Sequence, residues 1–215
     1  MYPYDLNTNL ASIQSKLAEQ VIKEDVSGDL DSIAGVDVSF SRGNQAVAAA
    51  VVMDLNTLQM MENSTLMVEL LFPYIPGFLG FREADATVSV LNSLKSGFDV
   101  LMVNGHGIIH PRGFGLASHV GILMDMPTLG VAKRLTVGRY KKGVVKVNDN
   151  CPLFIKSLNK MLGAYINGNY VSIGHKISLN TAIKLVKETS LFKTPEPLRQ
   201  AHILATNTFK RVLDG

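Results

Sequence analysis

The stretch "FDVLMVNGHGIIHPRGFGLASH", residues 98–119, decides the fold because a strand, a polar loop and a helix follow one another in it. Its short apolar run at 98–103 predicts a buried strand that ends at Asn104. A glycine-rich loop comes next, then a helix over about 115–124, then a second apolar run, "TLGVA", at 128–132. A strand, a helix and a strand in this order indicate a βαβ unit.

The sequence before this unit predicts three antiparallel strands. Two apolar runs are separated by "SRGN", whose residues favour a turn, so that they form a hairpin, and a third run is moderately strand-like. The three predicted strands cover residues 32–40, 45–55 and 58–70. Apolar residues spaced three or four apart predict helices at 10–23 and 81–96, and a hairpin around 166–169 and two C-terminal helices complete the chain.

Hairpins followed by a βαβ unit indicate an α/β fold, with a mixed central sheet and helices on both faces. At 215 residues and 47% apolar content, the chain has the size and composition of one domain with a large core, and we assign residues 1–215 to a single domain. The segment "YKKGVVKVNDNCP" is the best candidate for a flexible insertion.

Composition indicates the cellular compartment of the protein more clearly than its function. A formal charge of +3 is too small to indicate a nucleic-acid partner, although it leaves room for a locally basic groove. The single cysteine, Cys151, cannot form an internal disulfide, and the N-terminal residues have no leader-like pattern. No window is apolar enough for a membrane span. We therefore expect a soluble, monomeric protein of the reducing cytoplasm that does not bind membranes.

Three oxygen-bearing side chains are candidates for a metal site. Asp37 interrupts an apolar strand, where an ionised carboxylate is costly to bury, although a lone Asp is more often turned outward or bound to backbone amides. Glu83 lies near the start of a predicted helix, where a carboxylate commonly interacts only with the helix dipole. If the strands at 32–40 and 98–103 are neighbours, Asp37, Glu83 and Asn104 meet at one sheet edge. Such hard oxygen ligands suit Mg²⁺.

The loop after Asn104 suggests an anion or base site. Its glycines, Gly105 among them, allow close backbone approach and positive φ, although an ordinary tight loop explains them equally well. His110 and Arg112 are candidate phosphate contacts, because a guanidinium matches phosphate oxygens. The histidines at 106, 110 and 119 lack the further ligand that a structural zinc site needs, and His119 fits a packed or capping role better.

Two further residues are candidates for catalysis. Lys133 follows the strand "TLGVA", and strand ends deliver side chains to the active-site edge of α/β proteins, where an ammonium could neutralise a phosphoryl group. His202 comes one or two turns into a helix that begins near "PEP". Taken alone, each of these residues is more often an ordinary surface side chain.

Taken together, "GVDVSF", "FPYIPGFLGFRE", "NGHGIIHPRGFGLASHVG", "PTLGVAK", "GHKIS" and "PEPLRQAH" resemble the endonuclease V family in order and spacing. The resemblance covers nearly the whole chain. It implies an RNase H-like fold and an endonuclease that uses Mg²⁺, for which Mn²⁺ can substitute. The implied substrate is DNA, and possibly RNA, that contains deaminated bases, chiefly inosine. Cleavage is implied at the second phosphodiester 3′ to the lesion, in the course of DNA repair.

The resemblance also implies roles for single residues. Asp37 and Glu83 match acidic metal ligands, Lys133 a phosphate-stabilising lysine, and His202 a histidine near the attacking water. Tyr74 resembles a wedge that fills the gap when the damaged base leaves the stack. The backbone around Gly77, Leu79 and Gly105 would line the base pocket, with His110 in the adjoining loop.

Asn104 departs from the family pattern, which has Asp at this position. An amide oxygen can still bind Mg²⁺, but one negative charge is missing. Asp99 cannot replace it, because it lies five residues earlier on the same strand. The alternatives are a working natural variant, an inosine-binding paralogue without catalysis, and an altered chain that traps its substrate. A different RNase H-like nuclease, such as a junction resolvase, would keep the acids without needing "PYIP".

Overall fold

The computed structural model describes residues 4–26, 28–40, 44–135, 144–145, 154–157 and 160–213. Cys151 and most of the segment predicted to be a flexible insertion lie outside the described residues. Nine strands of the described chain form one sheet, in the order β3-β2-β1-β4-β5-β9-β8-β7-β6. Their bounds are β1 Ser32–Phe40, β2 Gln45–Asp54, β3 Met60–Glu69, β4 Val100–Asn104, β5 Thr128–Ala132, β6 Val144–Val145, β7 Phe154–Ser157, β8 Lys160–Ile166 and β9 Asn169–His175.

The pairing of strands confirms the predicted mixed sheet. β1 pairs with β2 and β2 with β3 in antiparallel register, as the turn "SRGN" and the three apolar runs predict. β4 lies parallel to β1 on one side and to β5 on the other, which is the expected βαβ unit. β5 to β9 and β9 to β8 are again antiparallel.

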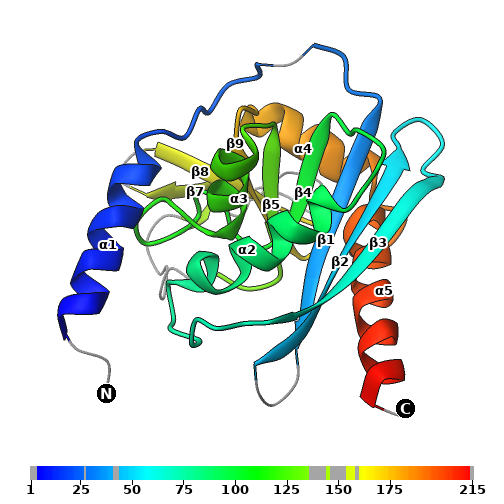
Figure 1. Cartoon of the computed structure of the whole chain (residues 1–215). Helices are drawn as coiled ribbons and strands as arrows, with labels where there is room; N and C mark the ends of the chain where they lie inside the picture. Colours follow the sequence, from blue (N-terminus) through cyan, green and yellow to red (C-terminus); the bar gives the residue numbers. More distant parts are fainter. Residues whose placement is uncertain are drawn as a thin grey trace.

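Helices cover both faces of the sheet, as predicted (Figure 1). α2 (Leu79–Asn92) and α3 (Leu116–Met124) pack on one face, and α4 (Leu179–Glu188) and α5 (Glu196–Leu213) on the other. The N-terminal helix α1 (Tyr4–Ala18) lies beside the loops that follow β4 (Figure 1).

Two predicted helices have different bounds in the structure. The helix expected at 10–23 begins at Tyr4 and ends at Ala18, because Val21 and Ile22 belong to the chain that leaves it. Val21 is buried in the core, and the Ile22 N–H donates to His175 Nδ1 at 3.3 Å. The burial of Val21 therefore reflects tertiary packing and not a longer helix, whereas the Ile22 side chain is exposed. The helix expected at 81–96 begins at Leu79 and ends at Asn92.

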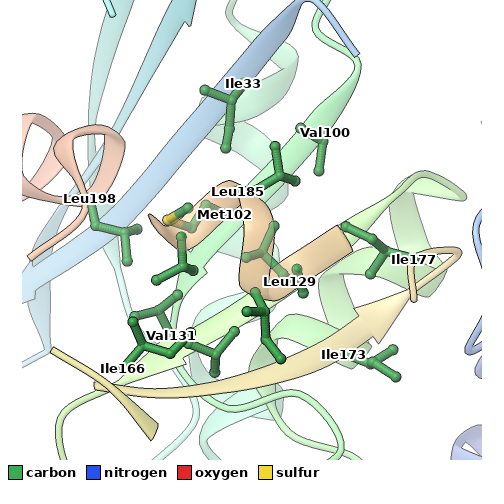
Figure 2. Close-up of a cluster of buried hydrophobic side chains, with 14 of the residues drawn as sticks. Ile33, Val100, Met102, Leu129, Val131, Ile166, Ile173, Ile177, Leu185 and Leu198 are labelled. Carbon is green, nitrogen blue, oxygen red and sulfur yellow. The ribbon is translucent and has the colours of Figure 1, made fainter. Parts of the chain in front are cut away.

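Alternate residues of the central strands face two apolar cores. One core lies between the sheet and α4 and α5, and Ile33, Met102 and Leu129 of the sheet belong to it together with Leu185 and Leu198 of the helices (Figure 2). The other core lies between the sheet and α2 and α3. β2 is buried along nearly its whole length, and its small alanines allow helices to approach from both sides.

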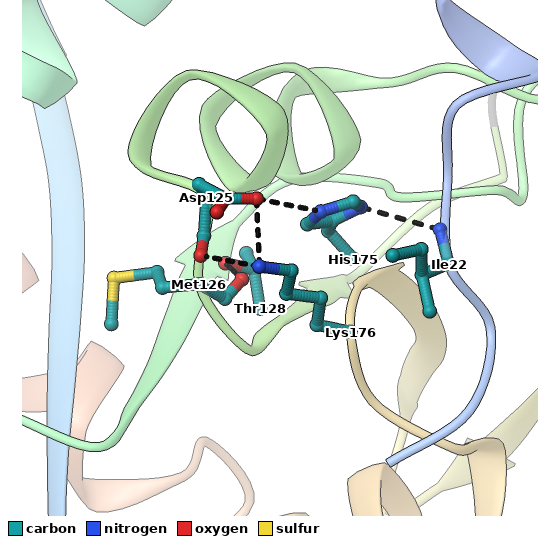
Figure 3. Close-up of polar contacts among 6 residues, drawn as sticks. All are labelled: Ile22, Asp125, Met126, Thr128, His175 and Lys176. Carbon is teal, nitrogen blue, oxygen red and sulfur yellow. Dashed lines mark hydrogen bonds and ion pairs between the residues drawn. The ribbon is translucent and has the colours of Figure 1, made fainter. Parts of the chain in front are cut away.

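A polar cluster joins the end of α3 to the end of β9, far along the chain (Figure 3). Asp125 ends α3 in the left-handed conformation, with φ of 50°. Lys176 Nζ contacts Asp125 Oδ1 at 2.7 Å and donates to the Asp125 carbonyl at 3.0 Å. His175 Nε2 lies 3.6 Å from the same carboxylate, and burial lowers the pKa of His175. The histidine of the "GHKIS" motif is thus a structural residue.

Candidate active site

Two of the three predicted ligands, Asp37 in β1 and Asn104 at the end of β4, lie side by side where the parallel pairing of the two strands ends. Val36 pairs with Val103 in the parallel register, so Asp37 and Asn104 come next to each other. The Asn104 Nδ2 donates to Asp37 Oδ1 at 2.7 Å. The expected proximity of these two side chains is therefore present, and it follows directly from the pairing of β1 with β4.

His202 reaches the same carboxylate from α5, 165 residues later in the chain. Its Nδ1 lies 2.7 Å from Asp37 Oδ2. α5 can approach β1 this closely because Gly35 has no side chain, and a Cβ there would collide with the backbone of Pro197. Asp37 is buried, whereas the His202 side chain is 61% exposed, so the imidazole presents its other nitrogen toward solvent.

Glu83 is a buried carboxyl group in the second turn of α2. Burial raises its pKa to about 8, and the negative charge of Asp37 adds to the rise, while the neighbouring Arg82 acts in the opposite direction. Arg82 itself donates through Nη1 to the Phe72 carbonyl. The protein thus holds Glu83 near Asp37 without enough positive charge to keep both carboxylates ionised at low cost.

These residues fit a divalent cation. Nearby buried oxygens that lack a compensating charge are what a hard cation binds, and a bound cation would favour the ionised form of Glu83. Within the described ranges, no group of three or more His, Cys, Asp and Glu side chains could hold a metal. The fit therefore depends on Asn104 as the third ligand. Its amide, which now donates to Asp37, would have to turn its oxygen toward the ion.

A cleft of about 320 Å³ opens beside this cluster. Asn104, Lys133 and His202 all line it, although they come from β4, the residue after β5, and α5. Lys133 is exposed, and Arg134 and Arg199 also line the cleft. Since the end of β5 lies beside β4, Lys133 is delivered to the same edge of the sheet as Asn104.

The loop of residues 73–78, which we call the wedge loop, precedes α2. Its Tyr74 side chain is 64% exposed, as a residue that inserts into a base stack must be. Gly77 has φ of +82°, a conformation that favours glycine. Leu79, which begins α2, lines the cleft. No side chain caps the N-terminus of α2, whose N-cap is Phe78.

Glycines after β4 allow chain segments to pack closely against one another. The Gly105 N–H donates to the carbonyls of Val103 and Val131 at 2.8 and 3.0 Å, so this amide is already engaged, although Gly105 does line the cleft. A Cβ on Gly107 would collide with the Ile173 carbonyl, and one on Gly115 with the His106 carbonyl. The absence of a Cβ at these two positions thus lets chain segments pack closely, and close approach of the loop backbone to a ligand stays a prediction.

Arg112 and His110 are drawn into the protein. Arg112 donates through Nη2 to the Gly77 carbonyl at 2.6 Å and through Nε to Gln14 Oε1 at 2.5 Å, and it lies 4.4 Å from the Phe78 ring centroid. Burial lowers the pKa of His110 to about 4, with the charges of Arg112 and His106 adding to it, so this imidazole is neutral at pH 7. A phosphate-binding role for the two residues stays a prediction, and their contacts favour support of the wedge loop.

The other histidines of the loop have separate surroundings. His106 is buried, and its Nε2 lies 2.6 Å from the Arg134 carbonyl, beside Lys133. The His119 ring packs edge-on against Phe81, with ring centroids 5.2 Å apart, and also contacts Phe114. The prediction that His119 is a packed residue is confirmed.

Two residues near the site were missed by the sequence analysis. Arg199 lines the cleft and contacts Glu196 through Nε and Nη2 at 2.7 and 2.5 Å. The three-residue spacing of an acid and a base in "PEPLRQAH" is a signal that could have found this pair. Gln14 contacts the wedge loop from α1, and nothing in its local sequence distinguishes it from other polar helix residues.

Comparison with known proteins shows one consistent likeness. The sequence model of the Endonuclease V family matches residues 15–203. Endonuclease V of Dictyoglomus thermophilum is 38% identical over 210 residues, which cover 94% of this chain and 91% of the relative. That of Rippkaea orientalis is 40% identical over 204 residues, with 91% and 88% covered.

Solved structures agree with this likeness. The catalytic domain of human Endonuclease V superposes with a TM-score of 0.87 at 31% identity, and 99% of each chain is covered. Ciona intestinalis Endonuclease V, in complex with a 24-mer DNA that contains an inosine followed by a ribo-adenosine, superposes with a TM-score of 0.87 at 27% identity, covering 97% of this chain and 99% of that one.

No helix in the described part of the chain is long and apolar enough to cross a membrane.

Proposed function

Because the chain belongs to the endonuclease V family of nucleases and has its RNase H-like fold, we propose that it is a Mg²⁺-dependent endonuclease that nicks inosine-containing DNA in repair. The scissile bond is the second phosphodiester 3′ to the deaminated base, and the products carry 3′-hydroxyl and 5′-phosphate ends. The protein acts as a monomer in the cytoplasm, and inosine-containing RNA is a possible second substrate.

The observation that carries this proposal is the convergence of Asp37, Asn104 and His202 at one sheet edge, with Lys133 on the same cleft. Asp37, Glu83 and Asn104 would hold Mg²⁺, and Mn²⁺ could replace it. When bound, the ion would supply Lewis-acid stabilisation of the phosphate and lower the pKa of a water. The remaining chemistry belongs to the side chains around it.

His202 would accept a proton from the attacking water. Its Nδ1–H donated to Asp37 leaves Nε2 with a lone pair on the solvent side. The water oxygen bonds to phosphorus, the bond from phosphorus to the 3′ oxygen breaks, and the 3′ oxygen takes a proton from a solvent water and leaves as a hydroxyl. Lys133 would stabilise the negative charge that develops on the phosphoryl oxygens.

Recognition of the lesion would come from the wedge loop and the start of α2. Tyr74 would fill the stack after the base leaves it. Hypoxanthine has a carbonyl where adenine has an amino group, so the uncapped N–H groups at Leu79 would accept hypoxanthine and be left unpaired by adenine. Gly77 lets the backbone turn toward the base, and Gly105 lies on the wall of the cleft.

Asn104 favours a second candidate function, that of a reader, which is a protein that binds inosine without cutting the nucleic acid. With an amide in place of the family's aspartate, the metal site has one negative charge fewer, and both Asp37 oxygens already accept hydrogen bonds. Lesion binding would survive this loss because the wedge loop is separate from the metal ligands.

The deciding experiment incubates the protein with a labelled duplex that carries one inosine, in Mg²⁺, Mn²⁺ or EDTA. The same duplex with adenosine and the Asp37→Ala variant are the controls, and matching RNA is tested in parallel. We expect a nick one nucleotide beyond the inosine that needs metal and Asp37. Retention on the inosine duplex without a nick would indicate a reader, and equal cutting of the adenosine duplex another type of nuclease.

A further inference from the structure

Gln14 of α1 is a buried polar side chain that joins three segments of the chain. It is 1% exposed, and its Nε2 donates to the Phe114 carbonyl at 2.7 Å and to the Gly77 carbonyl at 3.2 Å. Its Oε1 accepts the Nε–H of Arg112 at 2.5 Å. Both ends of the amide are thus satisfied, which is the condition under which a buried amide stabilises a unique arrangement.

The Gly77 carbonyl is the centre of this arrangement. It accepts hydrogen bonds from Gln14 Nε2 and from Arg112 Nη2, whose guanidinium also lies against the Phe78 ring. A Cβ on Gly77 would approach Arg112 Nη2 to 2.9 Å in addition to straining the backbone at φ of +82°. The closeness of Arg112 and the positive φ therefore both require glycine at position 77.

The hydrogen bonds to Gly77 orient more than one carbonyl. The Gly77 carbonyl and the Phe78 N–H belong to the same rigid peptide plane. The Phe78 N–H donates to the Ile75 carbonyl at 2.9 Å, so the plane is held from both sides. The peptide that follows begins α2 at Leu79, and Tyr74 lies three residues before Gly77. Gln14 and Arg112 thereby hold the peptide plane that lies between Tyr74 and the first N–H groups of α2.

We propose that Gln14 and Arg112 form a clamp, through which α1 positions the wedge loop for lesion recognition. Gln14 is a positioning residue, because it lies behind the loop and is buried from any ligand. Its neutral amide suits the role, since a carboxylate there would repel the carbonyl oxygens and neutralise Arg112. The consequence for recognition rests on the proposed function, whereas the ordering of the loop does not.

The test uses Gln14→Met, which keeps the length of the side chain and removes its hydrogen bonds. Thr189→Val is the matched control, because Thr189 is also fully buried and donates to a backbone carbonyl, that of Leu185, at the end of α4. Hydrogen exchange measured by mass spectrometry on the peptide that spans residues 72–81 reports the order of the loop. Nicking of inosine in duplex and in single-stranded DNA reports recognition.

We expect exchange in residues 72–81 to become about tenfold faster in Gln14→Met, as the loss of a buried hydrogen bond implies, and to stay unchanged in Thr189→Val. The KM for duplex inosine should rise about tenfold, while the single-turnover rate at saturation changes less than about twofold. Duplex DNA should be affected more than single strands. Arg112→Met should loosen the same peptide, and the double variant should be little worse than either single one, because the two residues act as a unit.

Unchanged exchange at 72–81 in both single variants would overturn the clamp. Equal rises in KM for Gln14→Met and Thr189→Val would overturn its role in recognition. Wild-type protein that ignores inosine would refute the proposed function instead, and the exchange measurement would still decide whether the clamp exists.

Discussion

Replacing Asn104 with Asp tests the metal site directly, because it alters charge with almost no change in shape. The Asn104 amide now donates to the buried Asp37 at 2.7 Å. Asn104→Asp removes this donor and places a second carboxylate against the first. Without metal, the variant should therefore be less stable than the protein with Asn104 near neutral pH.

The size of the loss has two contributions. A hydrogen bond to a charged group is worth roughly 1.5 to 3 kcal/mol, and two unit charges about 4 Å apart repel by about 4 kcal/mol at an effective dielectric constant of 20. Two facts limit their sum. Asn104 is exposed, so water screens the repulsion, and one carboxyl can take up a proton, which caps the electrostatic cost at about 4 kcal/mol at pH 7. We expect a net loss of about 2 to 4 kcal/mol.

In Mg²⁺, the Asn104→Asp variant should be more stable than the protein with Asn104. A carboxylate in place of an amide adds one negative charge to the ligand set, so the Mg²⁺ concentration for half-maximal nicking should fall about tenfold or more. The gain should be smaller with Mn²⁺, which binds such ligands more tightly. Thermal unfolding in EDTA and in increasing Mg²⁺, isothermal titration calorimetry and nicking assays measure these changes.

Asn104→Ala is the control, because it removes the hydrogen bond without adding a charge. It should lower stability in EDTA and should weaken the response to Mg²⁺. If Asn104→Asp leaves the Mg²⁺ dependence of both stability and nicking unchanged, Asn104 is not a ligand, and the three-residue metal site is wrong.

Three further predictions follow from the site. Tyr74→Ala should weaken binding and nicking of inosine in duplex DNA more than in single strands, because only a duplex has a stack to hold open; equal losses on both substrates would reject the wedge role. Lys133→Ala should lower the single-turnover cleavage rate about a hundredfold with little change in lesion affinity, and a large loss of affinity at an unchanged rate would indicate a binding role. Because the pKa of Glu83 is raised to about 8, the native state binds this proton more tightly than the unfolded chain does. Metal-free stability should thus fall as pH rises from about 4.5 to about 8, by at most about 1.4 kcal/mol per pH unit. Glu83→Gln should flatten this slope in urea unfolding measured across pH, and an unchanged slope would show that Glu83 does not cause it.

Local patterns were sufficient to predict most elements of the fold. Apolar runs bounded by turn residues predicted the bounds of β1, β2, β4 and β5 to within two residues. A strand that is buried on both faces is almost continuously apolar, so its ends are easy to recognise in the sequence. The prediction of α1 was less accurate, since Val21 continues the helical spacing although it is buried in the core after the helix has ended. Periodicity records which residues are buried and does not record which backbone conformation buries them.

The candidate site divides in the same way. Asp37 and Asn104 could be paired from the sequence once their strands were taken as neighbours, and their pairing depends only on the register of β1 and β4. The contact of His202 with Asp37 spans 165 residues and depends on how closely α5 approaches Gly35. The clamp of Gln14 on Gly77 likewise joins residues 63 positions apart. Strand pairing follows from short-range pattern, whereas contacts between a helix and a distant loop depend on the packing of the whole core, which only the tertiary structure decides.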